Sequence, residues 1–74
     1  MANLETLAAA IREHWREHER TLYRQLQTSG ELVERSEARA KRTLEMAAEL
    51  EAAGSDPIQA MGEARREVAF SRDL

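Results

Sequence analysis

The chain has 74 residues, enough for one small domain over 1–74, and its net charge of −3 reflects 11 basic and 14 acidic residues. It contains no cysteine, which excludes disulfides and thiolate metal sites. The longest wholly apolar run, residues 7–11, is too short to span a bilayer. We therefore expect neither a signal peptide nor a membrane partner, and a location in the cytoplasm, or in the virion if a phage encodes the chain.

Residues 4–28 form the first predicted helix. Asn3 is a suitable N-cap, and Gly30 suits the left-handed position that often follows a helix end. At about 100° per residue, one apolar arc runs along the whole segment. This arc is the predicted interaction face, made of Leu7, Ile11, Trp15, His18, Leu22, Tyr23 and Leu26.

The second predicted helix covers residues 31–53, and Thr28 and Glu31 have the spacing of a capping box at its start. Small and apolar side chains recur along it in a three-four pattern, which favours close contact with another helix. This seam contains Val33, Ser36, Ala40, Thr43, Ala47 and Leu50. Both long helices would span about 35 Å, so we expect them to pair along their whole lengths as a hairpin.

The third predicted helix covers residues 57–70, because Asp56 suits the N-cap and Pro57 the first helical position. We expect it to bury Ile58, Met61, Ala64 and Val68. Gly62 weakens this helix by about 1 kcal/mol relative to alanine, unless a close contact requires the missing side chain. Residues 71–74 are expected to form a loose tail.

The fold class is therefore all-α, with a long antiparallel helical hairpin and a short third helix, similar to a three-helix bundle. Such a hairpin has too little bulk to cover the whole apolar face of the first helix. We expect a homo-oligomer, a larger assembly or docking on another protein to complete the core.

His14 and His18 lie one helical turn apart, a spacing that can chelate a divalent metal. The zincin pattern, however, requires glutamate directly after the first histidine, where Trp15 stands, and no third ligand is identifiable. No nucleophile, base and acid combination or phosphate-binding loop is present either. We therefore expect no catalytic residue, no metal and no other cofactor.

Arg12, Arg16, Arg20 and Arg24 form a basic row on the flank of the first helix. The row could bind phosphates or an acidic partner, or it could be a solvated face paired with Glu13 and Glu17 at i,i+3. The paired face is the favoured interpretation. The same two interpretations apply to a second basic group, Arg35, Arg39, Lys41 and Arg42, which lacks interleaved aromatic residues. A helix-turn-helix DNA reader is disfavoured because the helix after Pro57 carries an acidic surface.

Three runs resemble the N-terminal half of TnpV-like small helical proteins of transposons and phages. They are His14-Trp15-Arg16-Glu17-His18, Leu22-Tyr23-Arg24-Gln25-Leu26 and Ser29-Gly30-Glu31-Leu32, and the segment 63–70 is similar to the tail of their shorter phage versions. This chain differs in having Glu19-Arg20 where those proteins carry proline, and Val68 where they carry a second tryptophan. The resemblance implies an accessory protein of a phage or mobile element and transfers no catalytic residue.

Together these observations predict a non-enzymatic helical protein–protein interaction module. In a phage or mobile element it would be a particle component or a small inhibitor that docks on a host or defence protein. The alternative is a nucleic-acid-binding regulator that uses the basic row of the first helix.

Overall fold

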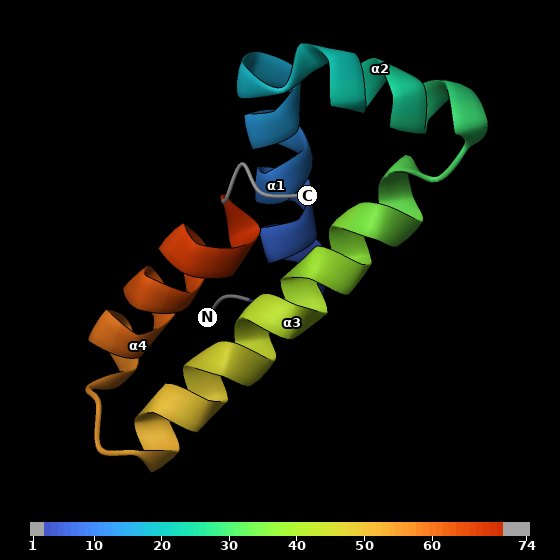
Figure 1. Cartoon of the computed structure of the whole chain (residues 1–74). Helices are drawn as coiled ribbons and strands as arrows, with labels where there is room; N and C mark the ends of the chain where they lie inside the picture. Colours follow the sequence, from blue (N-terminus) through green and yellow to red (C-terminus); the bar gives the residue numbers. More distant parts are fainter. Residues whose placement is uncertain (1–2, 71–74) are drawn as a thin grey trace.

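The computed structural model describes residues 3–70, which form helices joined by short turns (Figure 1). The elements are α1 (Leu4–His18), α2 (Arg20–Ser29), α3 (Leu32–Ala52), α4 (Pro57–Ala64) and the π-helical turn η1 (Arg65–Ala69). Residues 3–70 contain no strand, so the predicted all-α class is confirmed. The predicted tail, residues 71–74, lies outside the described part of the chain.

Helix α3 is the element against which the rest of the chain packs. The four central members of its predicted seam are buried, namely Ser36, Ala40, Thr43 and Ala47. Because these side chains are small, neighbouring backbones can approach α3 closely. Helix α4 does so as an antiparallel neighbour (Figure 1), and it contributes buried alanines of its own, Ala60 and Ala64.

The two hydroxyl groups in this seam are satisfied within α3 itself. The Ser36 Oγ donates to the Val33 carbonyl at 2.9 Å, and the Thr43 Oγ1 donates to the Arg39 carbonyl at 2.8 Å. Hydrogen bonds of this kind let serine and threonine lie inside a helix contact without an unpaired polar group. The seam therefore avoids the penalty that a buried hydroxyl would otherwise carry.

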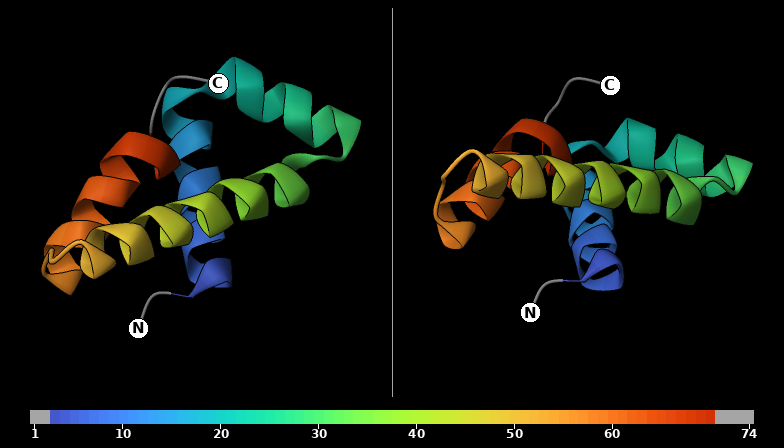
Figure 2. Two further views of the ribbon diagram at one scale, coloured as in Figure 1. Left: turned by 60° about the horizontal axis from the view of Figure 1, so that its bottom comes forward. Right: turned by 90° about the horizontal axis from the view of Figure 1, so that it is seen from below.

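Helix α1 crosses α3 instead of pairing with it along its length (Figure 2). Its side toward the core consists of Leu7, Ala8, Ile11 and Trp15, which are at most 2% exposed. They cluster with Leu26 of α2, Ala40 of α3 and Ala69 of η1. The predicted full-length hairpin of the first two helices is therefore wrong. The crossing lets the large side chains of α1 meet α3 and η1 together, which a parallel alignment on α3 alone would not allow.

The predicted single helix over residues 4–28 is also wrong, because the chain bends at Glu19. This residue has φ −130° and ψ 61°, outside the helical region, and it ends α1 and begins α2. Its N–H still donates to the Trp15 carbonyl at 2.7 Å, and its carbonyl accepts from the Tyr23 N–H at 2.9 Å. The bend thus turns the chain sharply while keeping these two backbone hydrogen bonds.

Tertiary packing accounts for this bend. A straight helix would carry Leu22 and Leu26 past α3 into solvent, whereas the bend returns α2 over the first turns of α3 (Figure 1). Burying one leucine side chain contributes about 1.5–3 kcal/mol. Each helical hydrogen bond exchanged for water at the start of α2 costs about 0.5–1.5 kcal/mol. Leu22, Tyr23 and Leu26, all in contact with the core, together offset that loss.

The third predicted helix is continuous through residue 69, but its buried face differs from the prediction. Ala64 is buried as predicted, but Ile58 is 84% exposed and Met61 and Val68 are only partly covered. Ala60 and Ala69, which were not predicted, are buried. Positions 58 and 60 lie about 200° apart on a helix, so contact through Ala60 turns Ile58 outward. The wider π turn then brings Ala69, five residues after Ala64, back onto the same face.

The predicted turns are largely confirmed. The Asn3 side chain accepts from the Thr6 N–H at 2.8 Å, and the Asp56 side chain accepts from the Ile58 N–H at 3.0 Å. Gly30 follows α2 with φ 81°, a conformation that disfavours any residue with a Cβ. The capping box of Thr28 and Glu31 is wrong: Glu31 occupies the N-cap of α3, and no side chain caps this helix start.

Gly62 offers a test of the α4 description. A Cβ built at this residue has no neighbouring atom within 4 Å, and the residue is exposed in mid-helix. Gly62→Ala is therefore expected to raise the free energy of unfolding by about 0.5–1 kcal/mol. Chemical denaturation monitored by circular dichroism measures this change. Gly30→Ala serves as the contrast, because its positive φ predicts a loss of stability; a destabilising Gly62→Ala would contradict the description.

Candidate functional site

An open groove of about 600 Å³ lies where the bend at Glu19 holds α2 away from α1 and over α3. Its residues come from all three helices, and they combine apolar and basic side chains. They are Trp15, Leu22, Gln25, Leu26, Arg35, Ala38, Arg39 and Arg42. The volume falls within the range typical of ligand sites in proteins, about 300–1,000 Å³.

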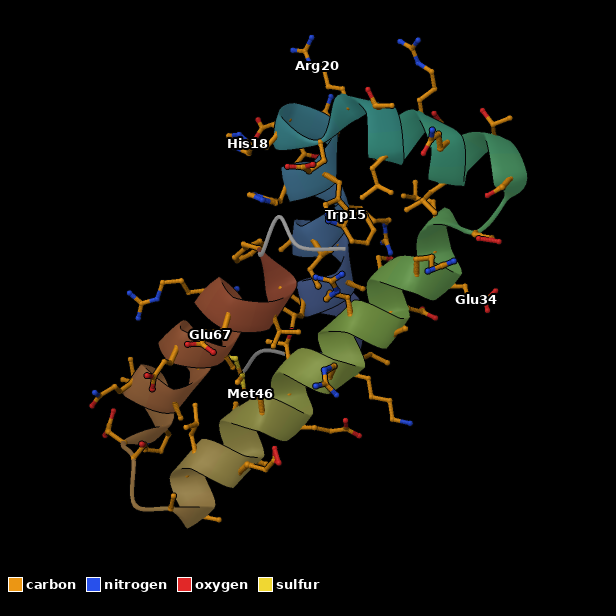
Figure 3. The ribbon with its side chains drawn as sticks, viewed as in Figure 1. Trp15, His18, Arg20, Glu34, Met46 and Glu67 are labelled. Carbon is orange, nitrogen blue, oxygen red and sulfur yellow. The ribbon has the colours of Figure 1, made fainter. Side chains whose placement is uncertain are left out.

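The apolar part of the groove is built around Trp15. Figure 3 shows this side chain extending from α1 into the space framed by α1, α2 and α3. Leu22 and Leu26 lie beside it because they follow each other by one turn on the inner side of α2. The Trp15 Nε1 is buried and has no hydrogen-bond partner. A buried N–H without an acceptor is uncommon and unfavourable, so this group lowers the stability of the core around Trp15.

The basic part comes from one side of α3, where Arg35, Arg39 and Arg42 follow one another at three-four spacing. Arg39 is engaged: its Nη1 donates to the Val68 carbonyl at 2.8 Å and thereby caps the end of η1. Arg35 makes a loose, exposed ion pair with Glu31 at 3.5 Å. Arg42 is exposed. Among the described residues that line the groove, three are basic and none is acidic, so this lining carries positive charge.

The predicted interaction face separates into three parts. Leu7 and Ile11 are fully buried within the chain's own core, which corrects the prediction that this part of the helix needs a partner to cover it. Tyr23 is half-buried against the same core. Trp15, Leu22 and Leu26 line the groove; Leu22 is partly exposed, whereas Trp15 is 2% and Leu26 9% exposed. The core closes around α1 because η1 and α3 cover it from two sides.

His18 was predicted to belong to the apolar arc, and this is wrong because its side chain is exposed. The packed side of α1 is centred on Leu7, Ile11 and Trp15, and His18 lies beyond it in the last turn, away from the groove (Figure 3). Its ring lies 4.8 Å from that of His14, whose ring in turn lies 4.9 Å from Phe70. Within residues 3–70, no three metal-binding side chains are gathered closely enough to share an ion.

The basic row predicted on the first helix does not form one surface. The bend places Arg12 and Arg16 on α1 but Arg20 and Arg24 on α2. The Arg12 Nη1 donates to the Ser36 Oγ at 2.7 Å, which ties α1 to α3. Arg16 pairs with Glu13, as predicted, and its Nε donates to the Glu13 Oε2 at 3.3 Å. Arg20 points away from the molecule at the start of α2 (Figure 3).

The groove itself was not predicted from the sequence, and Ala38 and Arg42 were not among the predicted site residues. The basic group on the second helix was noticed, but its proximity to Trp15 depends on the bend at Glu19. Neither glycine nor proline occurs there to signal a break. Residues 35, 38, 39 and 42 do share one helical face, and that spacing is the sequence signal for one wall of the groove.

The pairing of Arg16 can be tested by titration. Its hydrogen bond lowers the pKa of Glu13 below the ordinary glutamate value, so the pair is present above that pKa and is lost as the pH falls through it. Arg16→Gln should raise the Glu13 pKa toward the ordinary value, as measured by NMR of the side-chain carboxyl carbon. Arg20→Gln should leave it unchanged. An unaltered Glu13 pKa in Arg16→Gln would mean that Arg16 is not held by this pair.

Comparisons with protein-family models, with curated proteins and with solved structures return no match. The proposed function therefore rests on the chemistry of the groove. In the part of the chain that the structure describes, no helix is both long and apolar enough to cross a membrane.

Proposed function

We propose that this chain is a non-enzymatic interaction module whose groove binds an apolar segment of a protein partner flanked by carboxylates. The observation that carries the proposal is the composition of the groove. Trp15, Leu22 and Leu26 form an apolar floor, three arginines line one side, and none of the lining residues within 3–70 is acidic. An aromatic and aliphatic floor beside arginines is the composition typical of the energetically dominant centre of a protein interface.

The shape of the groove allows a side chain of the partner to insert, which a flat surface would not. Its floor lies between α2 and α3, so an inserted apolar group would lose part of its water contact. Its walls belong to α2 and α3, which Gly30 and Glu31 connect by a short turn. Rigid walls reduce the conformational entropy that binding must otherwise remove.

The charge of the wall selects the sign of the partner. Arg42 is exposed, and Arg35 is held only by an exposed pair with Glu31. Both guanidinium groups can therefore donate to a partner's carboxylate without breaking a strong interaction. Arginine binds carboxylates in a planar, two-bond geometry, which gives specificity as well as attraction.

The biological setting in this proposal rests on the resemblance to TnpV-like proteins alone. An accessory protein of a phage or mobile element, acting in a particle or as an inhibitor of a host or defence protein, would need a compact docking surface of this kind. The same groove chemistry would serve either role.

The test uses an acidic amphipathic peptide with leucines at i, i+3, i+4 and i+7 and glutamates on both flanks. The chain has one tryptophan, so the fluorescence of Trp15 reports binding directly. Saturable binding of this peptide is expected, with affinity falling as salt rises. Ala38→Glu combined with Arg42→Glu should weaken it by about tenfold or more, because a carboxylate then occupies the wall of the groove.

Two controls make this result specific. A peptide with lysine in place of each glutamate should bind poorly, since it meets the arginines with like charge. Lys41→Glu changes the charge of α3 by the same sign at an exposed position that does not line the groove, and should leave affinity within about twofold. Equal binding of both peptides, or equal loss in Lys41→Glu, would sink the proposal.

A further inference from the structure

The corner between α3 and α4 carries the most exposed large apolar side chain that the structure describes. Ile58 is 84% exposed, compared with 55% for Val33 and 38% for Leu4. Pro57 beside it and Ala53 before it are exposed as well, so the corner has an exposed apolar surface. The exposure follows from the fold, because contact through Ala60 and Ala64 turns this side of α4 away from α3.

The sequence around Ile58 is rich in acidic residues. Residues 43–64 contain five acidic side chains and no basic one, at Glu45, Glu49, Glu51, Asp56 and Glu63. Asp56 and Glu51 are exposed within the corner itself. We call Glu51, Ala53, Asp56, Pro57 and Ile58 the acidic corner. It has the composition that the groove requires, an exposed apolar side chain flanked by carboxylates.

The groove and the acidic corner lie at opposite ends of the molecule. The groove is lined by residues 35–42 of α3, and the acidic corner follows the C-terminal end of that helix, so about 20 Å of helix separates them. The molecule is elongated, with principal extents of 41 × 19 × 17 Å. The two surfaces therefore cannot meet within one molecule of this shape, but they can meet between two.

From these complementary ends we infer that the groove of one molecule binds the acidic corner of a second copy, with Ile58 inserted beside Trp15 and the carboxylates facing Arg35 and Arg42. This inference rests on the proposed function and names the partner. The contact joins two different surfaces, so it leaves a free groove at one end of a pair and a free corner at the other. Association then continues head to tail into longer chains, and it weakens with salt because exposed charges contribute to it.

The first experiment measures solution mass by light scattering of the full chain up to about 1 mM, a range chosen because small interfaces associate weakly. The wild-type mass is expected to rise with concentration beyond that of a dimer. Ile58→Asp should remain monomeric, and it should fold normally because an acidic residue in the first turn of a helix is favourable. Val33→Asp is the matched control, since it removes another exposed apolar side chain, and it should associate like the wild type.

The decisive step mixes two variants that cannot associate alone. Ile58→Asp keeps an intact groove, and Ala38→Glu with Arg42→Glu keeps an intact acidic corner. Each is expected to be monomeric by itself, whereas an equal mixture should form dimers that do not grow further. A mixture with no dimers, or a wild type that stays monomeric at about 1 mM, would overturn the inference.

These outcomes are separable from the fate of the proposed function. If the wild type does not associate but still binds the acidic peptide, the second copy is not the partner and the groove remains a binding site for another protein. If the mass rises equally in Ile58→Asp and in the groove variant, association uses a different surface and the inference is wrong. Loss of peptide binding by Ile58→Asp would also count against it, because that residue lies outside the groove.

Discussion

The contact between α1 and the small side chains of α3 is the constraint on which the rest of the structure depends. Leu7, Ile11 and Trp15 are buried in one cluster with Ala40, and the small side chains of Ser36 and Ala40 let α1 approach α3 closely. The Arg12 Nη1 hydrogen bond to the Ser36 Oγ fixes the register of that contact. Once α1 crosses α3 in this way, the chain after Trp15 must either leave the molecule or bend.

The bend at Glu19 is the resolution, and it produces the groove. Helix α2 returns toward α3 to bury Leu26, but it meets α3 only near the turn at Gly30. Between that turn and Trp15, α2 and α3 diverge, and the space between them stays open. The same event thus stabilises the small core and leaves an open groove beside it, lined in part by apolar side chains. A 74-residue chain has little surplus stability, and a groove of this size reduces the apolar area that the chain buries.

The sequence predicts the helical class, the cap at Asp56, the glycine at residue 30 and the central seam of α3. These features follow from local rules, since caps, turns and periodicity depend on neighbours in the chain. The bend at Glu19 could not be predicted in this way, because its cause is the burial of Leu22 and Leu26 against distant residues. The π turn at residues 65–69 is similar: it moves Ala69 onto the packed face, and only the position of α3 makes that favourable. The groove depends on the bend, so it was missed as well.

The proposed recognition between the groove of one molecule and the acidic corner of another gives both surfaces a use. The most direct measurement is the change in backbone amide NMR shifts of the wild type between dilute and concentrated samples. We expect two groups of shift changes, one at Leu22, Leu26, Ala38 and Arg42 and the other at residues 51–58. The Trp15 side-chain N–H should shift with the first group. Changes confined to other surfaces, or spectra that do not depend on concentration, would contradict the proposed recognition.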